Sequence, residues 1–112
     1  MSDVIVNVAT DFYPRPSGRY KLDGDHSGQA FRDDILFPKL NRVIEQNSDA
    51  KVVVDFTDVT MAGSSFLEEA FGGLIRVSKL DGKKVLAHLK IISSRKVIND
   101  RIQQYIREAA GI

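Results

Sequence analysis

The sequence predicts a small α/β domain in which helices pack on a mixed β-sheet. Two observations support this fold class. Short apolar runs that include β-branched residues occur near the N-terminus, in the middle of the chain and again after residue 84. Segments with apolar residues at helical spacing lie between these runs and after the last one. Alternation of strands and helices is typical of an α/β layer with a partly parallel sheet.

Length and composition indicate one folded domain over residues 1–112. The chain contains no linker-like tract, and 43% of its residues are hydrophobic and 28% charged, as in ordinary globular proteins. Lys and Arg number 16 against 15 Asp and Glu, so no positive excess predicts direct binding to nucleic acid. The absence of cysteine excludes disulfides and cysteine metal sites.

Neither membrane insertion nor secretion is predicted. No apolar run approaches the roughly 20 residues that a transmembrane helix needs. The first residues lack the basic region and the long apolar region of a signal peptide. We therefore expect a cytoplasmic protein that makes no contact with a membrane.

The first half of the chain is expected to hold two strands and a helix. Residues 4–9 are rich in β-branched side chains and predict a strand, and residues 19–22 could form a short second one. Ser27 should open a helix, because a serine hydroxyl at that position accepts a free backbone N–H. Pro38 should kink or split this helix near Phe37, because proline has no N–H to donate.

A strand, a turn and two serines form the most informative stretch. The apolar run over residues 51–56 predicts a central strand covered on both faces. The next helix should begin at Ser64 or Ser65, one of which would cap it, and Glu68 stands where a capping box has its glutamate. A serine placed there can be a structural cap, an anion contact or a phosphorylation site, and the residues alone leave these alternatives open.

The last part of the chain should hold a strand and a helix. Residues 85–92 predict the strand, and the two serines at 93–94 are expected to cap a helix that ends at Gly111. Inside the preceding helix, the glycine pair at 72–73 is locally unfavourable. Such a pair often marks a place where another backbone approaches closely.

No constellation of residues predicts catalysis. Ser64, His88 and Asp55 supply the residue types of a hydrolase triad, but no GxSxG motif surrounds the serine. The only other histidine, His26, is far from His88 in the sequence, and no HExxH motif is present. The glycine-rich nucleotide motifs GxxxxGK[ST] and GxGxxG are also absent. We therefore expect no enzymatic activity, no metal and no cofactor.

A second group of residues could bind an anion or a partner. Arg19 and Arg32 flank the predicted helix start at Ser27 and Gly28, where guanidinium groups and free backbone N–H groups could hold an anion together. Glu68 is a further candidate contact for a partner. Alternatively, the two arginines pair with neighbouring aspartates and only fix the loop.

These motifs resemble the STAS domain of bacterial anti-sigma-factor antagonists. More specifically, they resemble the STAS-like family of uncharacterised bacterial domains. The segments that carry the resemblance are Gly18-Arg19, Ser27-Gly28 with Phe31-Arg32, and residues 64–72. In the antagonists, a serine that starts the helix after the central strand is phosphorylated by a partner that is both kinase and anti-sigma factor.

The resemblance implies a STAS-like fold and a regulatory role in bacterial signalling. Ser64 takes the place of the antagonists' modified serine and Ser65 that of the second, whereas Gly63 replaces an aspartate and Phe66 a glycine. We therefore expect a non-enzymatic protein–protein interaction module, with Ser64 or Ser65 as the phosphorylation site. The implied partner is a histidine-kinase-like ATPase or anti-sigma factor, and a homo-oligomer is compatible with the sequence.

Two alternatives to this function stay open. One is a small anion- or nucleotide-binding domain that uses Arg19, Ser27, Gly28 and Arg32. The other is an accessory subunit of a DNA-binding protein. In that case the partner would contact the DNA, because the balanced charge of this chain predicts no direct binding to nucleic acid.

Overall fold

Three strands form one parallel sheet in the computed structural model, which describes residues 2–112. Strand β2 (Val52–Asp55) lies between β1 (Val4–Asn7) and β3 (Leu89–Ile92), with Val52 opposite Val4 and Leu89. The prediction of a small α/β domain with a central strand near residue 52 is confirmed. The described residues form a parallel sheet, so the expectation of a mixed one was wrong.

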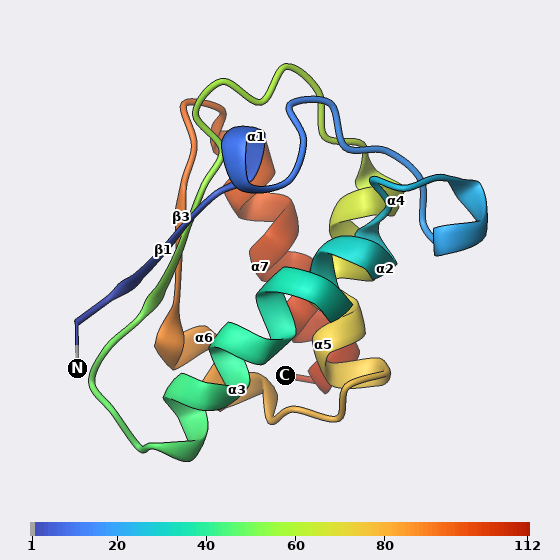
Figure 1. The fold of residues 1–112 in the computed structure, drawn as a ribbon. Coiled ribbons are helices and arrows are strands. Elements are labelled where there is room, and N and C mark those ends of the chain that lie inside the picture. Colours follow the sequence, from blue (N-terminus) through green and yellow to red (C-terminus); the bar gives the residue numbers. More distant parts are fainter. Residues whose placement is uncertain (1) are drawn as a thin grey trace.

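The helices connect the strands and gather on one side of the sheet (Figure 1). The first connection contains α2 (Gly28–Phe31), the π-helical segment η2 (Arg32–Leu36) and α3 (Phe37–Glu45). The second contains α4 (Ser64–Leu67), the π-helical segment η3 (Glu68–Gly72), α5 (Gly73–Arg76) and α6 (Gly82–His88). Helix α7 (Lys96–Ala110) follows β3.

The core lies between the sheet and these helices. Val52 and Val54 of the central strand are completely buried on the face that meets the helices. On the opposite face Ile5 is 60% exposed and Lys90 is exposed, while Val53 between them is only 4% exposed. Because successive side chains of a strand point to opposite faces, the central strand is buried on both faces and the two outer strands on one. The largest completely buried apolar side chains are Phe31, Leu36, Leu40, Phe66, Leu67, Phe71, Leu74, Ile102 and Ile106.

Pro38 lies where the first connecting helix changes its winding. The backbone N–H of Phe37 donates to the carbonyl of Arg32, five residues earlier, and α3 starts at Phe37 with Pro38 in its first turn. The missing N–H of Pro38 falls where the winding changes from π to α, while the backbone stays helical from Gly28 to Glu45. The helix is therefore not split near Phe37; the predicted disturbance takes the form of a π-turn.

Two predicted strands are shorter or absent. Residues 19–22 form no strand; instead the 3₁₀ turn η1 (Lys21–Asp23) occupies this loop. The Asp23 carboxylate accepts the backbone N–H groups of Arg19 and Tyr20, at 3.2 and 2.8 Å, and so closes the turn locally. Strand β1 ends at Asn7, whose side chain caps the short helix α1 (Val8–Asp11) by accepting from Thr10.

The strand predicted over residues 85–92 begins only at Leu89. Asp81 caps helix α6 by accepting the backbone N–H of Lys83 at 2.9 Å, so Asp81-Gly82 is a helix start as well as a turn. His88 therefore ends a helix instead of lying in a strand, and its ring nitrogens lie 2.8 Å from the Lys84 carbonyl and 2.9 Å from that of Ser48.

The ends of α7 fit the prediction in part. Gly111 ends the helix with a left-handed backbone (φ 71°), as predicted. The N-cap is Arg95 and not one of the serines; the Ser93 hydroxyl instead accepts the Arg95 N–H in the turn before the helix. Among the helices of residues 2–112, none has the length and apolar character needed to cross a membrane.

Candidate functional site

The two serines lie at the exposed start of the helix that follows β2. The N-cap is Gly63, with an extended backbone (φ −70°, ψ 159°), so Ser64 and Ser65 are the first two residues of the helix. Neither side chain makes a capping hydrogen bond, and both residues are exposed. The predicted serine cap was wrong, because the chain enters the helical conformation one residue earlier than expected.

The body of this helix is firmly anchored. Its backbone continues from Ser64 through the π-turn of η3 to Arg76. Phe66, Leu67, Ala70, Phe71 and Leu74 are completely buried on its inner side. Phe66 lies in an aromatic cluster with Phe12 and Phe31, so it fills the core instead of changing the surface beside the serines. The serines therefore occupy the tip of a rigid element, with the positive end of the helix dipole beneath them.

Segments that follow β1 and β3 hold the loop that leads to the serines. The Thr60 N–H donates to the Pro14 carbonyl at 2.9 Å, and Arg95 Nη2 donates to the Thr60 carbonyl at 3.4 Å. Met61, three residues before Ser64, is 59% exposed. This end of the molecule thus presents hydroxyl groups beside an apolar side chain, which we call the serine surface (residues 61–65).

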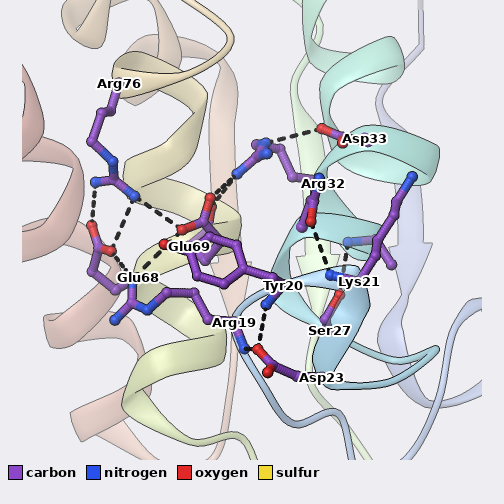
Figure 2. Close-up of polar contacts among 12 residues, drawn as sticks. Arg19, Tyr20, Lys21, Asp23, Ser27, Arg32, Asp33, Glu68, Glu69 and Arg76 are labelled. Carbon is purple, nitrogen blue, oxygen red and sulfur yellow. Dashed lines mark hydrogen bonds and ion pairs between the residues drawn. The ribbon is translucent and has the colours of Figure 1, made fainter.

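A buried ion pair joins the two connecting helices (Figure 2). Arg32 Nη1 lies 2.5 Å from Glu69 Oε2 and 2.8 Å from the Glu69 carbonyl, and Arg32 Nε lies 3.1 Å from Asp33 Oδ1. The side chains of Arg32 and Glu69 are only 2% and 3% exposed. Two charges so deeply buried are tolerated because each is paired and hydrogen-bonded.

Glu68 extends this pair into a larger cluster. Its carboxylate accepts from Arg19 and, at 2.6 and 3.1 Å, from Arg76, while Arg76 also reaches Glu69 Oε1 at 3.2 Å (Figure 2). We call these five residues, Arg19, Arg32, Glu68, Glu69 and Arg76, the arginine–glutamate cluster. No buried side-chain nitrogen or oxygen of residues 2–112 lacks a hydrogen-bond partner, so the cluster is internally satisfied.

The cluster shifts the pKa values of its outer members. Burial alone would raise the pKa of the Glu68 carboxyl, but hydrogen bonds from Arg76 and Arg19 and their positive charges outweigh it. The pKa of Glu68 therefore lies below its ordinary value. The hydrogen bonds to Glu68 raise the pKa values of Arg19 and Arg76 despite their partial burial. All three groups are thus held in their charged forms.

Two glycines make room for these contacts. A Cβ at Gly28 would lie 2.5 Å from the Phe66 carbonyl oxygen, so α2 can cross α4 this closely only without a side chain. A Cβ at Gly73 would overlap the guanidinium of Arg32. The glycine pair at 72–73 was predicted to admit another backbone. At Gly73 it admits a side chain instead, and the close backbone approach occurs at Gly28.

The structure separates the predicted site residues into three groups. Ser27 is fully buried and caps α2, as predicted, by accepting the Ala30 N–H at 3.1 Å, with Gly28 beside it. Arg19, Arg32 and Glu68 meet in the arginine–glutamate cluster, where carboxylates of the chain itself occupy both guanidinium groups. Ser64 and Ser65 stand apart on the surface. This geometry favours pairing within the chain over anion binding, but the main partners are Glu68 and Glu69 and not the predicted aspartates, of which only Asp33 takes part.

The sequence interpretation missed Glu69 and Arg76. Apart from its neighbour Glu68, Glu69 lies among apolar residues, with Leu67 before it and Ala70 and Phe71 after it. A carboxylate on such a buried stripe is rarely left unpaired, and Arg32 occupies a similar position after Phe31. Two opposite charges on two buried helix faces were therefore the available signal for an ion pair between them.

A family model described as a STAS-like domain of unknown function (DUF4325) matches residues 27–99. The chain belongs to this family. The matched region begins at the Ser27 cap and contains the serine surface and every member of the arginine–glutamate cluster except Arg19. It confirms the resemblance drawn from the serine motif. No curated protein and no solved structure gives a significant match to the chain.

The capping assignments predict contrasting stabilities for two serine variants. Ser27→Ala should lower the free energy of unfolding by about 1 kcal/mol or more, because it removes a buried cap. Ser64→Ala should change it by less than about 0.5 kcal/mol, because its hydroxyl caps nothing. Urea unfolding followed by circular dichroism measures both. An equal loss in the two variants would contradict the assignment of Gly63 as the N-cap.

The buried pair predicts strong coupling between Arg32 and Glu69. Arg32→Met should destabilise the protein by about 3–5 kcal/mol, because it leaves a buried carboxylate short of its partner. Arg32→Met with Glu69→Leu should recover much of this loss, since no charge then remains buried there. Chemical unfolding of the two single variants and the double variant gives the coupling. Additive losses would argue against a direct pair.

The lowered pKa of Glu68 predicts acid sensitivity. A carboxyl whose pKa is lowered in the folded protein stabilises it fully at pH values above its pKa in the unfolded chain, about 4.3. This stabilisation is lost as the pH falls through the lower pKa of the folded protein. The difference in unfolding free energy between the wild type and Glu68→Gln should therefore be largest near neutral pH and shrink below about pH 4. Urea titrations across this range test it; a difference independent of pH would contradict the charged pairing.

Proposed function

We propose that this STAS-like chain is a non-enzymatic regulatory protein–protein interaction module whose docking is controlled by phosphorylation of Ser64. The observation that carries the proposal is the exposed Ser64 side chain, which starts a helix without capping it. Such a hydroxyl is accessible to a kinase, and its modification breaks no contact of the fold. Ser65, exposed beside it, is the alternate acceptor.

Electrostatics give the switch its direction. A phosphate adds about −1.5 to −2 charges at neutral pH. The helix N-terminus tolerates that charge, because its dipole and its free N–H groups favour an anion. A partner that covers exposed Met61 with an apolar surface would have to desolvate the phosphate, and an acidic partner would be repelled. Phosphorylation should therefore release the partner and leave the fold intact.

The partner that fits this role is a histidine-kinase-like ATPase that also acts as an anti-sigma factor. Support comes from the family's STAS-like character and from the place of Ser64 after the central strand. The pair would work in the cytoplasm of a bacterium, where ATP supplies the phosphate. Gly63, in place of the antagonists' aspartate, is extended and caps the helix, so a kinase would recognise other residues of the serine surface.

Paired substitutions test the proposal. Ser64→Asp should weaken binding to the partner by about a hundredfold, which corresponds to a few kcal/mol, whereas Ser64→Ala should preserve it. The tagged variants are incubated with extract of the source cells, and the captured kinase-like ATPase is quantified by mass spectrometry. Phosphopeptide mapping of the wild type, after addition of ATP, should place one phosphate on Ser64.

Ser94 supplies the matched control. It is also exposed and also precedes a helix, at the start of α7. Ser94→Asp and Ser94→Ala should both bind as the wild type does. Equal capture by Ser64→Asp and Ser64→Ala, or a phosphate placed on Ser94 alone, would refute the switch.

A further inference from the structure

Both edges of the three-stranded sheet, at β1 and at β3, are unpaired among the described residues, and the β1 edge adjoins a cavity. Strand β1 pairs with β2 on one side only. The Val4 N–H donates to the Lys51 carbonyl at 2.8 Å, so by the alternation along a strand the N–H and C=O of Ile5 point to the free side. Asn7 is closed to an incoming strand, because its N–H already donates to the Asp11 carboxylate at 2.8 Å. The available edge therefore lies around Ile5, in the first half of β1.

A cavity adjoins the start of this strand. It has a volume of about 250 Å³ and is lined by Val4 of β1 and by Lys39, Arg42 and Val43 of α3. Val43 is buried and belongs to the core, whereas Lys39 and Arg42 are exposed. The cavity thus combines apolar walls with two cationic groups. It lies beside a strand edge where the backbone N–H and C=O of Ile5 are free to form hydrogen bonds.

The two cations have no acidic partner within residues 2–112. Neither Lys39 nor Arg42 takes part in a salt bridge or a side-chain hydrogen bond there. They are three residues apart on one helix, so their like charges face each other and repel. The carboxylate of Asp3, which precedes β1, accepts the Lys51 N–H at 2.9 Å and pairs with neither cation. A bound anion would relieve this repulsion.

We propose that the β1 edge and this cavity form a docking groove for an acidic peptide segment of a partner protein. The peptide adds to β1 as an extended strand and exchanges backbone hydrogen bonds with Ile5. A carboxylate of the peptide lies between Lys39 and Arg42, and an apolar side chain fills the space against Val4 and Val43. Charge complementarity selects this occupant over a second copy of the chain, because β1 itself (Val4–Asn7) carries no charged residue and the Asp3 carboxylate beside it already accepts the Lys51 N–H.

This groove is distinct from the serine surface. Val4 begins β1, whereas the loop that leads to Ser64 leaves the opposite, carboxyl end of the parallel sheet. The module therefore has two docking regions at opposite ends of its strands. A peptide held in the groove leaves Ser64 accessible to a kinase, so either proposal can fail without the other.

Selection from a library of random displayed peptides on the immobilised chain tests the groove. Enriched sequences should carry acidic residues beside β-branched ones, and binding of a synthetic copy should weaken as salt is raised. Lys39→Glu with Arg42→Glu should weaken the affinity by at least about tenfold, measured by fluorescence anisotropy. Lys96→Glu with Arg101→Glu, which reverses two exposed charges of α7, should leave it unchanged. No acidic enrichment, or equal loss in both double variants, would overturn the proposal.

A second pair of variants tests strand addition itself. Ile5→Pro removes the one N–H of β1 that is unoccupied at the free edge and spares the bonds to β2, so it should abolish peptide binding. Ile5→Ala keeps that N–H and should retain most of the affinity. Thermal unfolding checks that both variants fold. If Ile5→Pro does not fold, the double variant Lys39→Glu with Arg42→Glu remains the test of the groove. Binding that survives Ile5→Pro in a folded protein would refute strand addition. A dimer that Ile5→Pro dissociates would show that a second copy occupies the edge.

Discussion

The buried pair of Arg32 and Glu69 is the constraint on which the rest of the arrangement depends. Each residue lies in a π-turn of its helix, and the two π-turns pack against each other. A buried charge is costly without its partner, so neither helix can slide along the other or rotate without exposing an unpaired charge to an apolar surrounding. The pair therefore fixes the relative position of the two connections that lie on the sheet.

The outer members of the cluster pass this constraint on to the surface. Glu68 holds Arg19, and Arg19 begins the loop that contains η1. The same helix carries Ser64 one turn before Glu68, so the loop and the serine surface are both attached to one rigid helix. Docking at the serine surface, as proposed above, would cost little conformational entropy, because the backbone there is already ordered.

The fold followed from local patterns, whereas the cluster did not. The valine run of β2, the Ser27 cap and Gly111 each act through their immediate neighbours in the chain, and each was predicted correctly. The pairing of Arg32 with Glu69 joins residues 37 positions apart, and no local rule connects them. The errors at helix starts arose differently. Gly63 is a weaker N-cap signal than the serines that follow it, and the apolar run after residue 84 was interpreted as a strand although Asp81 is a strong N-cap.

The two π-turns also limit how this domain can vary in length. A π-turn carries one residue more than an α-turn, and each added or removed helical residue rotates everything beyond it by about 100°. Loss of one residue from Glu68–Gly72 would turn Glu69 away from Arg32 or move the serines out of line with the buried stripe below them. Insertions and deletions in related chains should therefore collect in the exposed loops, such as residues 57–62, and leave the spacing between the serines and the two glutamates unaltered.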